Sequence, residues 1–360
     1  MNVAAFLPNW IGDAVMATPA IRALRALATG KLIGVCRPYV ADVFDGAPWF
    51  DDLMFLDRRA WSQGWPGVAW KLRREQVDVA VLFPNSFRVA LAAWLGKCKR
   101  RIGFRRYLRG GLLTDGLDPV RDADGGYQPT PIIDDYNRLA MTAGTPWPGH
   151  RLELFTTATD EAAADSALAA LEIDPSRDLI CLNPGAAFGS AKHWYAESFA
   201  TLARDLAEQR HASILVLCGP GERDMARQIA ALAAHPAIHH VADQPLSLGL
   251  TKALVRRCQL LVTTDSGPRH FAAAFERPVV TLFGPTHIAW TETYFDKAVH
   301  VQKKVPCGPC QQRVCPQGHH QCMRELTPAE VFAAASALLA RQLPHRQSPA
   351  QEHILQRRAS

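Results

Sequence analysis

The sequence lacks an apolar run long enough to cross a membrane. The longest candidate is Val89–Gly96, whereas a spanning helix needs about 20 apolar residues. The first residues also lack a basic segment followed by an apolar one, so we expect no secretory signal peptide. These two absences together predict a cytoplasmic protein.

Several nucleotide-site motifs are missing as well. No G-x-G-x-x-G follows the first strand-like run, the turn at Gly219–Gly221 has the wrong spacing, and no G-x-x-x-x-G-K-[S/T] is present. A nicotinamide dehydrogenase and a P-loop ATPase are therefore disfavoured. No D-x-D motif stands at a strand end, which favours chemistry that requires no metal cofactor.

The composition is that of an ordinary globular protein. Its 360 residues are 48% hydrophobic and 21% charged, which suggests two domains with substantial cores. The formal charge of +6 is mild. Of nine cysteines, five are scattered through strand-like or apolar segments and read as reduced, buried side chains: Cys36, Cys98, Cys181, Cys218 and Cys258.

Strand-like and helix-like segments alternate along the chain. The first half has strand-like runs at 3–7, 31–36 and 77–83, with a helix from the first run to about Ala28. After a proline-rich stretch at 145–154, a second cycle begins, with strand-like runs at 178–185, 258–267 and 278–286. This alternation predicts an α/β fold with parallel sheets. We expect two doubly wound, Rossmann-like domains facing a cleft, with a domain over 1–154, a second over 155–344 and a polar, basic tail over 345–360.

Asp13 stands at the turn between the first strand and the first helix. A carboxylate there suits capping of the helix, because it accepts hydrogen bonds from free amides. It also suits chemistry, because ligands of open α/β sheets bind at the carboxyl ends of the strands. The turn by itself leaves both readings open.

Turns at four strand ends in the second half combine glycine with small hydroxyl residues: "NPGAAFGSAKHW", "CGPGERD", "TTDSGPRH" and "FGPT". Glycine lets the backbone approach a ligand, and free amides at a helix start attract anions. Lys192 adds a full positive charge, although a solvated surface lysine is the alternative. Together the turns predict a nucleotide or nucleotide-sugar site.

The stretch from Arg88 to Arg109 contains basic residues and no acid. It would suit a phosphorylated, acidic acceptor or an anionic membrane surface; a solvated basic face is the alternative. Nucleic-acid binding is disfavoured, because among the basic residues from Lys97 to Arg109 only Phe104 and Tyr107 interleave as stacking aromatics, and no nucleic-acid module is visible.

Four cysteines cluster in the segment 307–322, with His319 and His320 among them: Cys307, Cys310, Cys315 and Cys322. These ligand types suit a structural Zn²⁺ site. The spacing is not that of a standard zinc motif, so thiols packing a short loop, or disulfides formed on lysis, are the alternatives.

Five stretches in order, "NWIGDAVMATPAIRAL", "LFPNSFRVAL", "NPGAAFGSAKHW", "TTDSGPRHFAAAFERPVVTLFGPT" and "CGPCQQRVCPQGHHQCM", resemble the bacterial ADP-heptose:lipopolysaccharide heptosyltransferases of glycosyltransferase family 9. The residues of these motifs are most similar to those of the heptosyltransferase II branch. The resemblance implies a GT-B fold, with the acceptor on the first domain and ADP-heptose on the second. It also implies inverting, metal-independent transfer of heptose to the lipopolysaccharide inner core, at the inner face of the inner membrane.

The resemblance also assigns roles to residues. Asp13 becomes the general base, and Lys192 the group that stabilises departing ADP. Donor binding is expected from Gly185, Ser190, Glu222, Thr263, Thr264, Asp265, Ser266, Gly267 and His270. Acceptor binding is expected from Gly12, Asn85, Ser86, Arg100, Arg101, Arg105 and Arg106. A relative acting on another nucleotide sugar or acceptor, and a nucleotide-binding protein without catalysis, are the alternatives.

Overall fold

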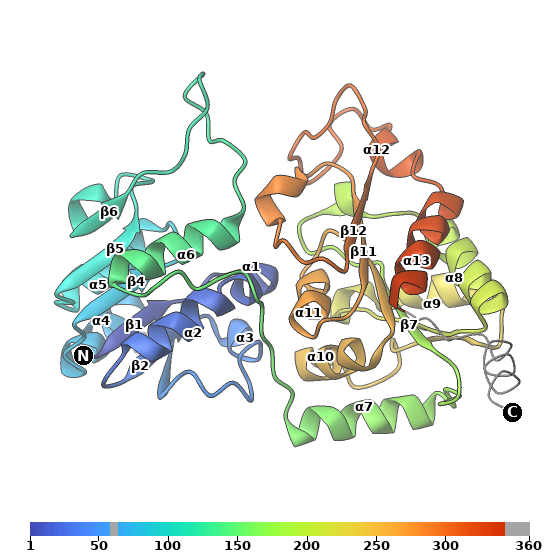
Figure 1. The fold of residues 1–360 in the computed structure, drawn as a ribbon, viewed down its shortest axis with the longest axis horizontal. Helices are drawn as coiled ribbons and strands as arrows, with labels where there is room; N and C mark the ends of the chain where they lie inside the picture. The colour runs from blue at the N-terminus through green and yellow to red at the C-terminus, as the bar shows by residue number, and fades with distance from the viewer. Residues whose placement is uncertain (58–63, 343–360) are drawn as a thin grey trace, which may run out of the picture.

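The first half of the chain folds around one parallel sheet. The computed structural model describes residues 1–57 and 64–342, and Figure 1 shows them as two lobes. In the first lobe the described strands pair in the order β3-β2-β1-β4-β5-β6. Their bounds are β1 (Val3–Phe6), β2 (Leu32–Cys36), β3 (Asp52–Phe55), β4 (Val79–Leu82), β5 (Arg100–Phe104) and β6 (Asp115–Leu117).

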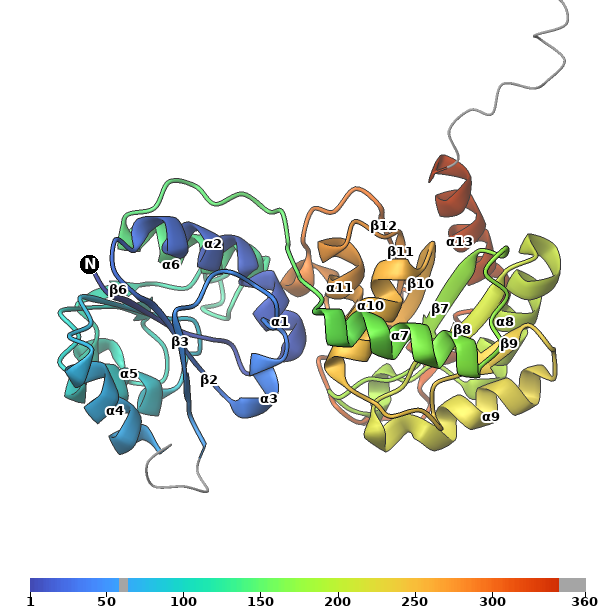
Figure 2. The ribbon, with the colours of Figure 1, turned by 90° about the horizontal axis from the view of Figure 1, so that it is seen from below.

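Helices cover both faces of this sheet (Figure 2). One face carries α1 (Ile11–Met16), α2 (Thr18–Leu27) and α6 (Ile132–Ala143), and the other carries α4 (Trp65–Arg74) and α5 (Phe87–Leu95). Two short elements complete the described part of the lobe: α3 (Pro38–Ala41) and the 3₁₀ turn η2 (Gly110–Leu112).

The first helix differs from its prediction. A single helix to about Ala28 was expected, but the chain forms α1 and then α2, which restarts at Thr18 with Pro19 in its first turn. A proline inside a continuous helix would remove a hydrogen bond and clash with the preceding turn. Proline is tolerated at a helix start, so the helix is interrupted there.

The second lobe repeats the architecture, with its described strands parallel in the order β12-β11-β10-β7-β8-β9. Their bounds are β7 (Leu179–Asn183), β8 (Ser213–Val216), β9 (Ile238–His240), β10 (Leu260–Thr264), β11 (Val279–Phe283) and β12 (Ala298–Gln302). The helical elements are α7 (Ala158–Ala170), η3 (Ser190–Lys192), α8 (Ala196–Arg210), η4 (Pro220–Glu222), α9 (Arg223–Ala233), α10 (Leu248–Arg257), α11 (Pro268–Ala274), η5 (Ile288–Thr291), α12 (Gln321–Arg324) and α13 (Pro328–Gln342).

Central strands of both sheets are buried along their whole length. Every residue of β1, β4, β7, β10 and β11 is buried. A parallel sheet covered on both faces requires this, since neither side of its strands meets water. The predicted α/β class is therefore confirmed.

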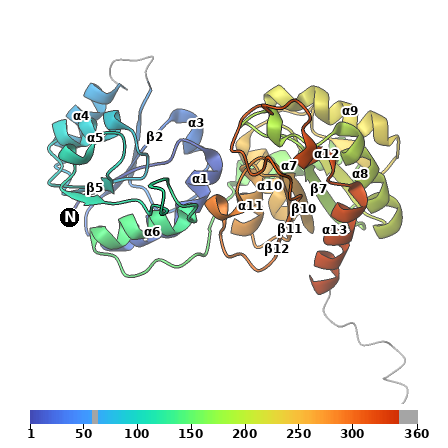
Figure 3. The same ribbon diagram turned by 90° about the horizontal axis from the view of Figure 1, so that it is seen from above.

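The two lobes touch where α1 meets α11 (Figure 3). A second contact comes from Lys252 of α10, whose Nζ donates to the backbone carbonyls of Asp42 at 2.9 Å and Asp45 at 3.3 Å in the first lobe. A third joins the Tyr294 hydroxyl to Asp134 Oδ2 at 2.8 Å. These contacts place the carboxyl ends of β1 and β10 on either side of one interface.

Over the part of the chain that the structure describes, no helix is both long and apolar enough to cross a membrane. The tail expected over 345–360 lies outside the described residues.

Candidate active site

Asp13 lies in the first turn of α1, directly after β1. The N-cap of this helix is Trp10, and no side chain caps it by a hydrogen bond. Burial, together with the nearby charge of Asp265, raises the pKa of Asp13 to about 7, although Lys192 acts in the opposite direction. A carboxylate of the first lobe thus lies within electrostatic reach of two second-lobe residues, and its pKa suits a base that works near neutrality.

Lys192 is held by Asp265. Its Nζ, on the turn η3 after β7, lies 2.5 Å from Asp265 Oδ2 and donates to the Asp265 carbonyl at 3.0 Å. The Asp265 carboxylate also accepts from the Thr286 hydroxyl at 2.7 Å and pairs with Arg269 at 3.4 Å. Burial alone would raise the pKa of Asp265, but Lys192 and Arg269 outweigh it and lower that pKa to about 2. Two cations and one anion leave this buried cluster with one net positive charge.

Two glycines, Gly12 and Gly267, allow a close approach where the lobes meet. A Cβ on Gly12 would lie 3.0 Å from Cδ2 of His270, and one on Gly267 would lie 3.3 Å from Ile11. His270 is buried, and burial together with the charge of Arg269 holds its pKa well below the usual range. The neutral imidazole therefore packs between the lobes, where it touches Gly12.

The hydroxyl residues at the end of β10 and in the turn after it mainly bind their own chain. Thr264 donates to the Gly185 carbonyl at 2.6 Å, and the Asn183 side chain donates to both Thr263 and Ser266 at 3.0 Å. Thr263 and Thr264 are fully buried. They hold the turns after β7 and β10 together. Of these three hydroxyl residues, only Ser266 is partly exposed.

Glu222 lies against the turn after β7. A Cβ on Gly185 would come within 2.1 Å of Glu222 Oε2, and this carboxylate accepts from the Gly219 backbone amide at 2.9 Å. A side chain at position 185 would therefore displace the Glu222 carboxylate. Ser190 is exposed at the start of η3.

Arginines expected to bind the acceptor are largely occupied within the chain. Arg100 pairs with Asp115 at 2.8 Å, and Arg105 pairs with Asp118 at 2.8 Å. Further bonds run from Arg100 to the carbonyls of Thr142 and Ala143, and from Arg101 to those of Cys98 and Leu112. These guanidinium groups fasten β5 to the segments around it.

Two arginines of this stretch differ from the others. The Arg106 guanidinium lies 4.1 Å from the centre of the Tyr127 ring, and its buried Nε has no hydrogen-bond partner among the described residues. Arg109 is fully buried and donates to the carbonyl of Phe104 and, at 2.9 Å, to the side chain of Asn85. Ser86 is exposed at the N-cap of α5.

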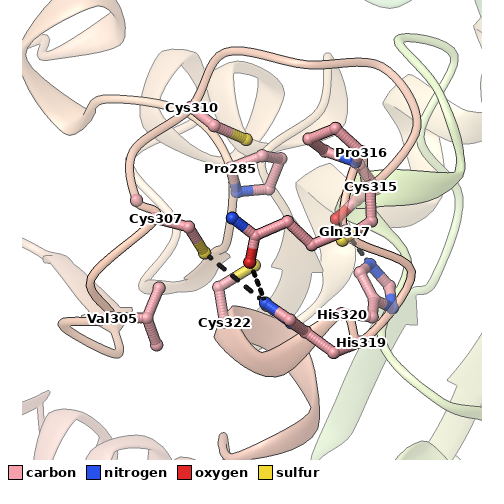
Figure 4. Close-up of a pocket in the computed structure, with 12 residues that line it drawn as sticks. Pro285, Val305, Cys307, Cys310, Cys315, Pro316, Gln317, His319, His320 and Cys322 are labelled. Carbon is pink, nitrogen blue, oxygen red and sulfur yellow. Dashed lines mark hydrogen bonds between the residues drawn. The ribbon is translucent and has the colours of Figure 1, made fainter.

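The four clustered cysteines line a small cavity of about 20 Å³ with His319 and His320 (Figure 4). Backbone amides led by that of His320 lower the pKa of Cys315, and burial plus the neighbouring thiols raise that of Cys322. However, no three His, Cys, Asp or Glu side chains of residues 1–57 and 64–342 are arranged to hold one metal ion. The expected zinc site is therefore not supported.

This cysteine-rich segment instead supports the turn that carries Lys192. The Arg313 carbonyl accepts from the Ala191 amide at 3.0 Å, and His320 Nε2 bonds the Ala191 carbonyl at 2.8 Å. A Cβ on Gly189, whose φ is +155°, would strike the Arg313 carbonyl oxygen at 2.3 Å. The segment thus fixes the backbone next to Lys192.

Sequence reasoning missed Asn183, Arg269 and Arg313. Asn183 ends a buried strand just before the Pro-Gly turn, a position that signals a polar role. Arg269 precedes His270 in a helix whose burial the sequence does not reveal. The Arg313 guanidinium lies 5.9 Å from the Trp10 ring of the first lobe and 5.3 Å from that of Phe188, a contact that depends on how the lobes meet.

Comparisons with known proteins agree on one family. The family described as glycosyltransferase family 9 (heptosyltransferase) matches residues 67–321. Lipopolysaccharide heptosyltransferase 2 of Salmonella typhimurium is 27% identical, covering 94% of this chain and 99% of that protein. Lipooligosaccharide heptosyltransferase 2 of Haemophilus ducreyi is 29% identical, covering 94% and 100%.

Solved structures share the fold. Escherichia coli ADP-heptose lps heptosyltransferase II superposes with a TM-score of 0.74 at 23% identity, covering 95% of this chain and 99% of that one. A family 9 glycosyltransferase from Veillonella parvula gives a TM-score of 0.79 at 20% identity, covering 95% and 97%. Escherichia coli heptosyltransferase WaaC, solved with ADP-2-deoxy-2-fluoro heptose, gives 0.65 at 17% identity, covering 94% and 99%. The expected GT-B arrangement is confirmed, and this chain belongs to glycosyltransferase family 9, the heptosyltransferases.

Proposed function

We propose that this glycosyltransferase moves heptose from ADP-heptose to the inner core of lipopolysaccharide, with inversion at the anomeric carbon. The observation that supports it most is the approach of Asp13, from the first lobe, to the Lys192–Asp265 pair of the second. Related proteins named as lipopolysaccharide heptosyltransferases, and a relative solved with an ADP-heptose analogue, support the donor and acceptor classes.

In the proposed reaction, Asp13 accepts the proton of an acceptor hydroxyl. The hydroxyl oxygen forms a bond to the anomeric carbon of heptose, on the face opposite ADP. The bond from that carbon to the diphosphate oxygen breaks, and its electron pair leaves with ADP. One oxygen replaces the other from the opposite side, so the configuration inverts. A positioned base contributes about 10²–10⁴-fold to such a rate.

The second lobe would stabilise the departing ADP. Its cluster of Lys192, Arg269 and Asp265 has a net positive charge. Fixed charges of this kind act strongly where water is excluded. Since these groups supply the positive charge, the proposed step requires no metal ion. Glu222, which ends η4 and lies against the turn after β7, would accept hydrogen bonds from the ribose hydroxyls.

The first lobe would hold the acceptor near Asp13, with the enzyme working as a peripheral protein at an anionic membrane surface. Ser86, exposed beyond β4, and Arg106, whose Nε lacks a partner among the described residues, are the acceptor-binding residues that we favour. The other arginines are occupied within the chain.

Turnover with synthetic ADP-heptose and lipopolysaccharide acceptors truncated at defined lengths tests the proposal. We expect release of one ADP per heptose added, and only with an acceptor that ends in the inner core. ADP-heptose bound without transfer to any acceptor would indicate a binding protein. Transfer from a different nucleotide sugar at a higher rate would indicate a relative with another donor.

A further inference from the structure

Large apolar side chains are exposed along one side of the first lobe. Trp70 on α4 is 58% exposed and Trp94 on α5 is 48% exposed. Both helices cover the same face of the sheet and contact each other (Figure 2). We call the exposed side chains of this region the α4–α5 face; its apolar members are Trp70, Phe87, Trp94, Leu95, Tyr107 and Leu108.

The turn at Tyr107–Leu108 extends this face beyond the start of α5. Both residues have positive φ, 51° and 59°, and the Leu108 side chain is 97% exposed. Buried Arg109 anchors the turn by donating to the carbonyl of Pro84 and the side chain of Asn85, just before α5. The Leu108 side chain is thus exposed to water on a turn that the hydrogen bonds of Arg109 hold in place.

Cations surround these apolar groups. Arg73, Arg74, Arg88 and Lys97 are all exposed, and the Arg74 guanidinium lies 4.8 Å from the centre of the Trp70 ring. Residues 65–109 include eleven Lys or Arg and only two acidic residues, so this stretch is more positive than the whole chain, whose formal charge is +6. The rest of the chain is therefore net negative, and the positive charge is concentrated here.

We propose that the α4–α5 face docks on an anionic phospholipid bilayer, with its aromatic rings at headgroup level and Leu108 pointing into the lipid. Tryptophan and tyrosine favour the membrane–water interface, and basic residues are attracted to anionic headgroups. A second copy of the chain fits poorly, because its own cations would oppose these. The inference rests on the proposed function to the extent that a lipid-linked acceptor lies in such a membrane.

Sedimentation of the full chain with vesicles tests the docking. We expect at least tenfold stronger partitioning onto vesicles of phosphatidylglycerol and phosphatidylcholine than onto phosphatidylcholine alone, and a loss of this preference in high salt. The double variant Trp70→Ser/Trp94→Ser should bind at least tenfold more weakly. Trp147→Ser, which removes an equally exposed ring from outside the face, should bind as the unmodified protein does.

Three outcomes would overturn the docking surface. One is unchanged vesicle binding by the double variant, with its unfolding midpoint in urea also unchanged. Another is self-association of the unmodified protein that the double variant abolishes, which would make the face a contact between copies. The third is binding of DNA or RNA in preference to anionic vesicles.

The double variant Arg73→Gln/Arg88→Gln gives an independent check, since it should reduce the preference for anionic lipid without removing any aromatic ring.

A water-soluble, delipidated acceptor separates this inference from the proposed function. With that acceptor, Trp70→Ser/Trp94→Ser should transfer heptose at the unmodified rate, because α4 and α5 cover the face of the sheet opposite to α1, which carries Asp13. If the unmodified protein transfers nothing but still binds anionic vesicles through the α4–α5 face, the proposed reaction fails and the docking surface stands.

Discussion

The Nζ atom of Lys192 and the Oδ2 atom of Asp265 lie 2.5 Å apart in a buried ion pair, although 73 residues separate them in the sequence. The turn after β7 contributes one and the turn after β10 the other. These strands are neighbours at the point where the strand order of the sheet reverses. Asp13 follows β1, which has the corresponding place in the first sheet. Ligands of open α/β sheets bind at such points.

Asp13→Asn should lower transfer by about 10²–10⁴-fold, because an amide cannot accept the proton of the attacking hydroxyl. Binding of ADP, followed by calorimetry, should stay within about threefold, since Asp13 belongs to the other lobe. Asp224→Asn is the matched control, because it neutralises a fully exposed carboxylate on α9. A rate for Asp13→Asn within tenfold of the unmodified enzyme would rule out the base.

The pH profile should reflect the raised pKa of Asp13. The pKa rises from 3.8 to about 7, so the carboxyl is protonated and inactive as a base below that pH. We expect kcat/KM to fall about tenfold per pH unit below 7 and to level off above it. Asp13→Asn should flatten this acid limb. A limb centred near pH 4 would instead show that the carboxyl is not desolvated during turnover.

Lys192→Met should cost about 3 kcal/mol of unfolding free energy, because it leaves the buried Asp265 carboxylate with a partner missing. Lys99→Met makes the same change in an exposed ion pair with Asp78, where the lysine side chain is 75% exposed, and should cost less than about 1 kcal/mol. Urea unfolding of both variants provides the comparison. Equal costs would contradict the burial of the Lys192 pair.

The double variant Lys192→Met/Asp265→Asn separates stability from catalysis. Removing both charges avoids an unpaired buried carboxylate, but buried Arg269 then loses the anion with which it pairs, so we expect unfolding free energy to recover only part of the loss. The cluster keeps one net positive charge through Arg269, but transfer should remain low because the Lys192 ammonium that faces departing ADP is still absent. Recovery of transfer along with stability would assign Lys192 a structural role alone.

Sequence patterns anticipated the sheets and the position of Asp13. Continuous apolar runs such as Val79–Leu82 are typical of strands buried on both faces, and their alternation with helices favours parallel sheets. Asp13 directly follows the first such strand, so its place at the sheet edge follows from chain order.

Contacts between distant segments were not predictable in this way. That Lys192 is paired with Asp265 depends on β7 lying beside β10, which the strand order decides. A run of basic residues shows its charge but not its partners, so Arg100 and Arg101 looked free although they bind neighbouring carbonyls. The cysteine spacing likewise could not show that the segment supports the Lys192 turn.

Gly12→Ala tests the contact between the lobes. The added methyl would lie 3.0 Å from Cδ2 of His270, so α1 and α11 must separate by a few tenths of an ångström. Small misplacements of reacting groups are costly, and we expect roughly tenfold lower kcat/KM with little change in unfolding free energy. Gly221→Ala, where a Cβ meets open space, should have no effect. Full activity in Gly12→Ala would mean that the lobes separate during turnover.

Arg109→Met tests whether the basic stretch serves structure or acceptor binding at this position. The Arg109 guanidinium is buried and donates to the carbonyls of Phe104 and Pro84 and to the side chain of Asn85. Methionine would leave those buried acceptors without a donor, so unfolding free energy should fall by about 3 kcal/mol. Arg105→Met, at an exposed ion pair with Asp118, should cost less than about 1 kcal/mol. If Arg109→Met left the stability unchanged and raised the KM for the acceptor, Arg109 would instead be an acceptor-binding residue. The lost guanidinium would then have contacted the acceptor and not the surrounding chain.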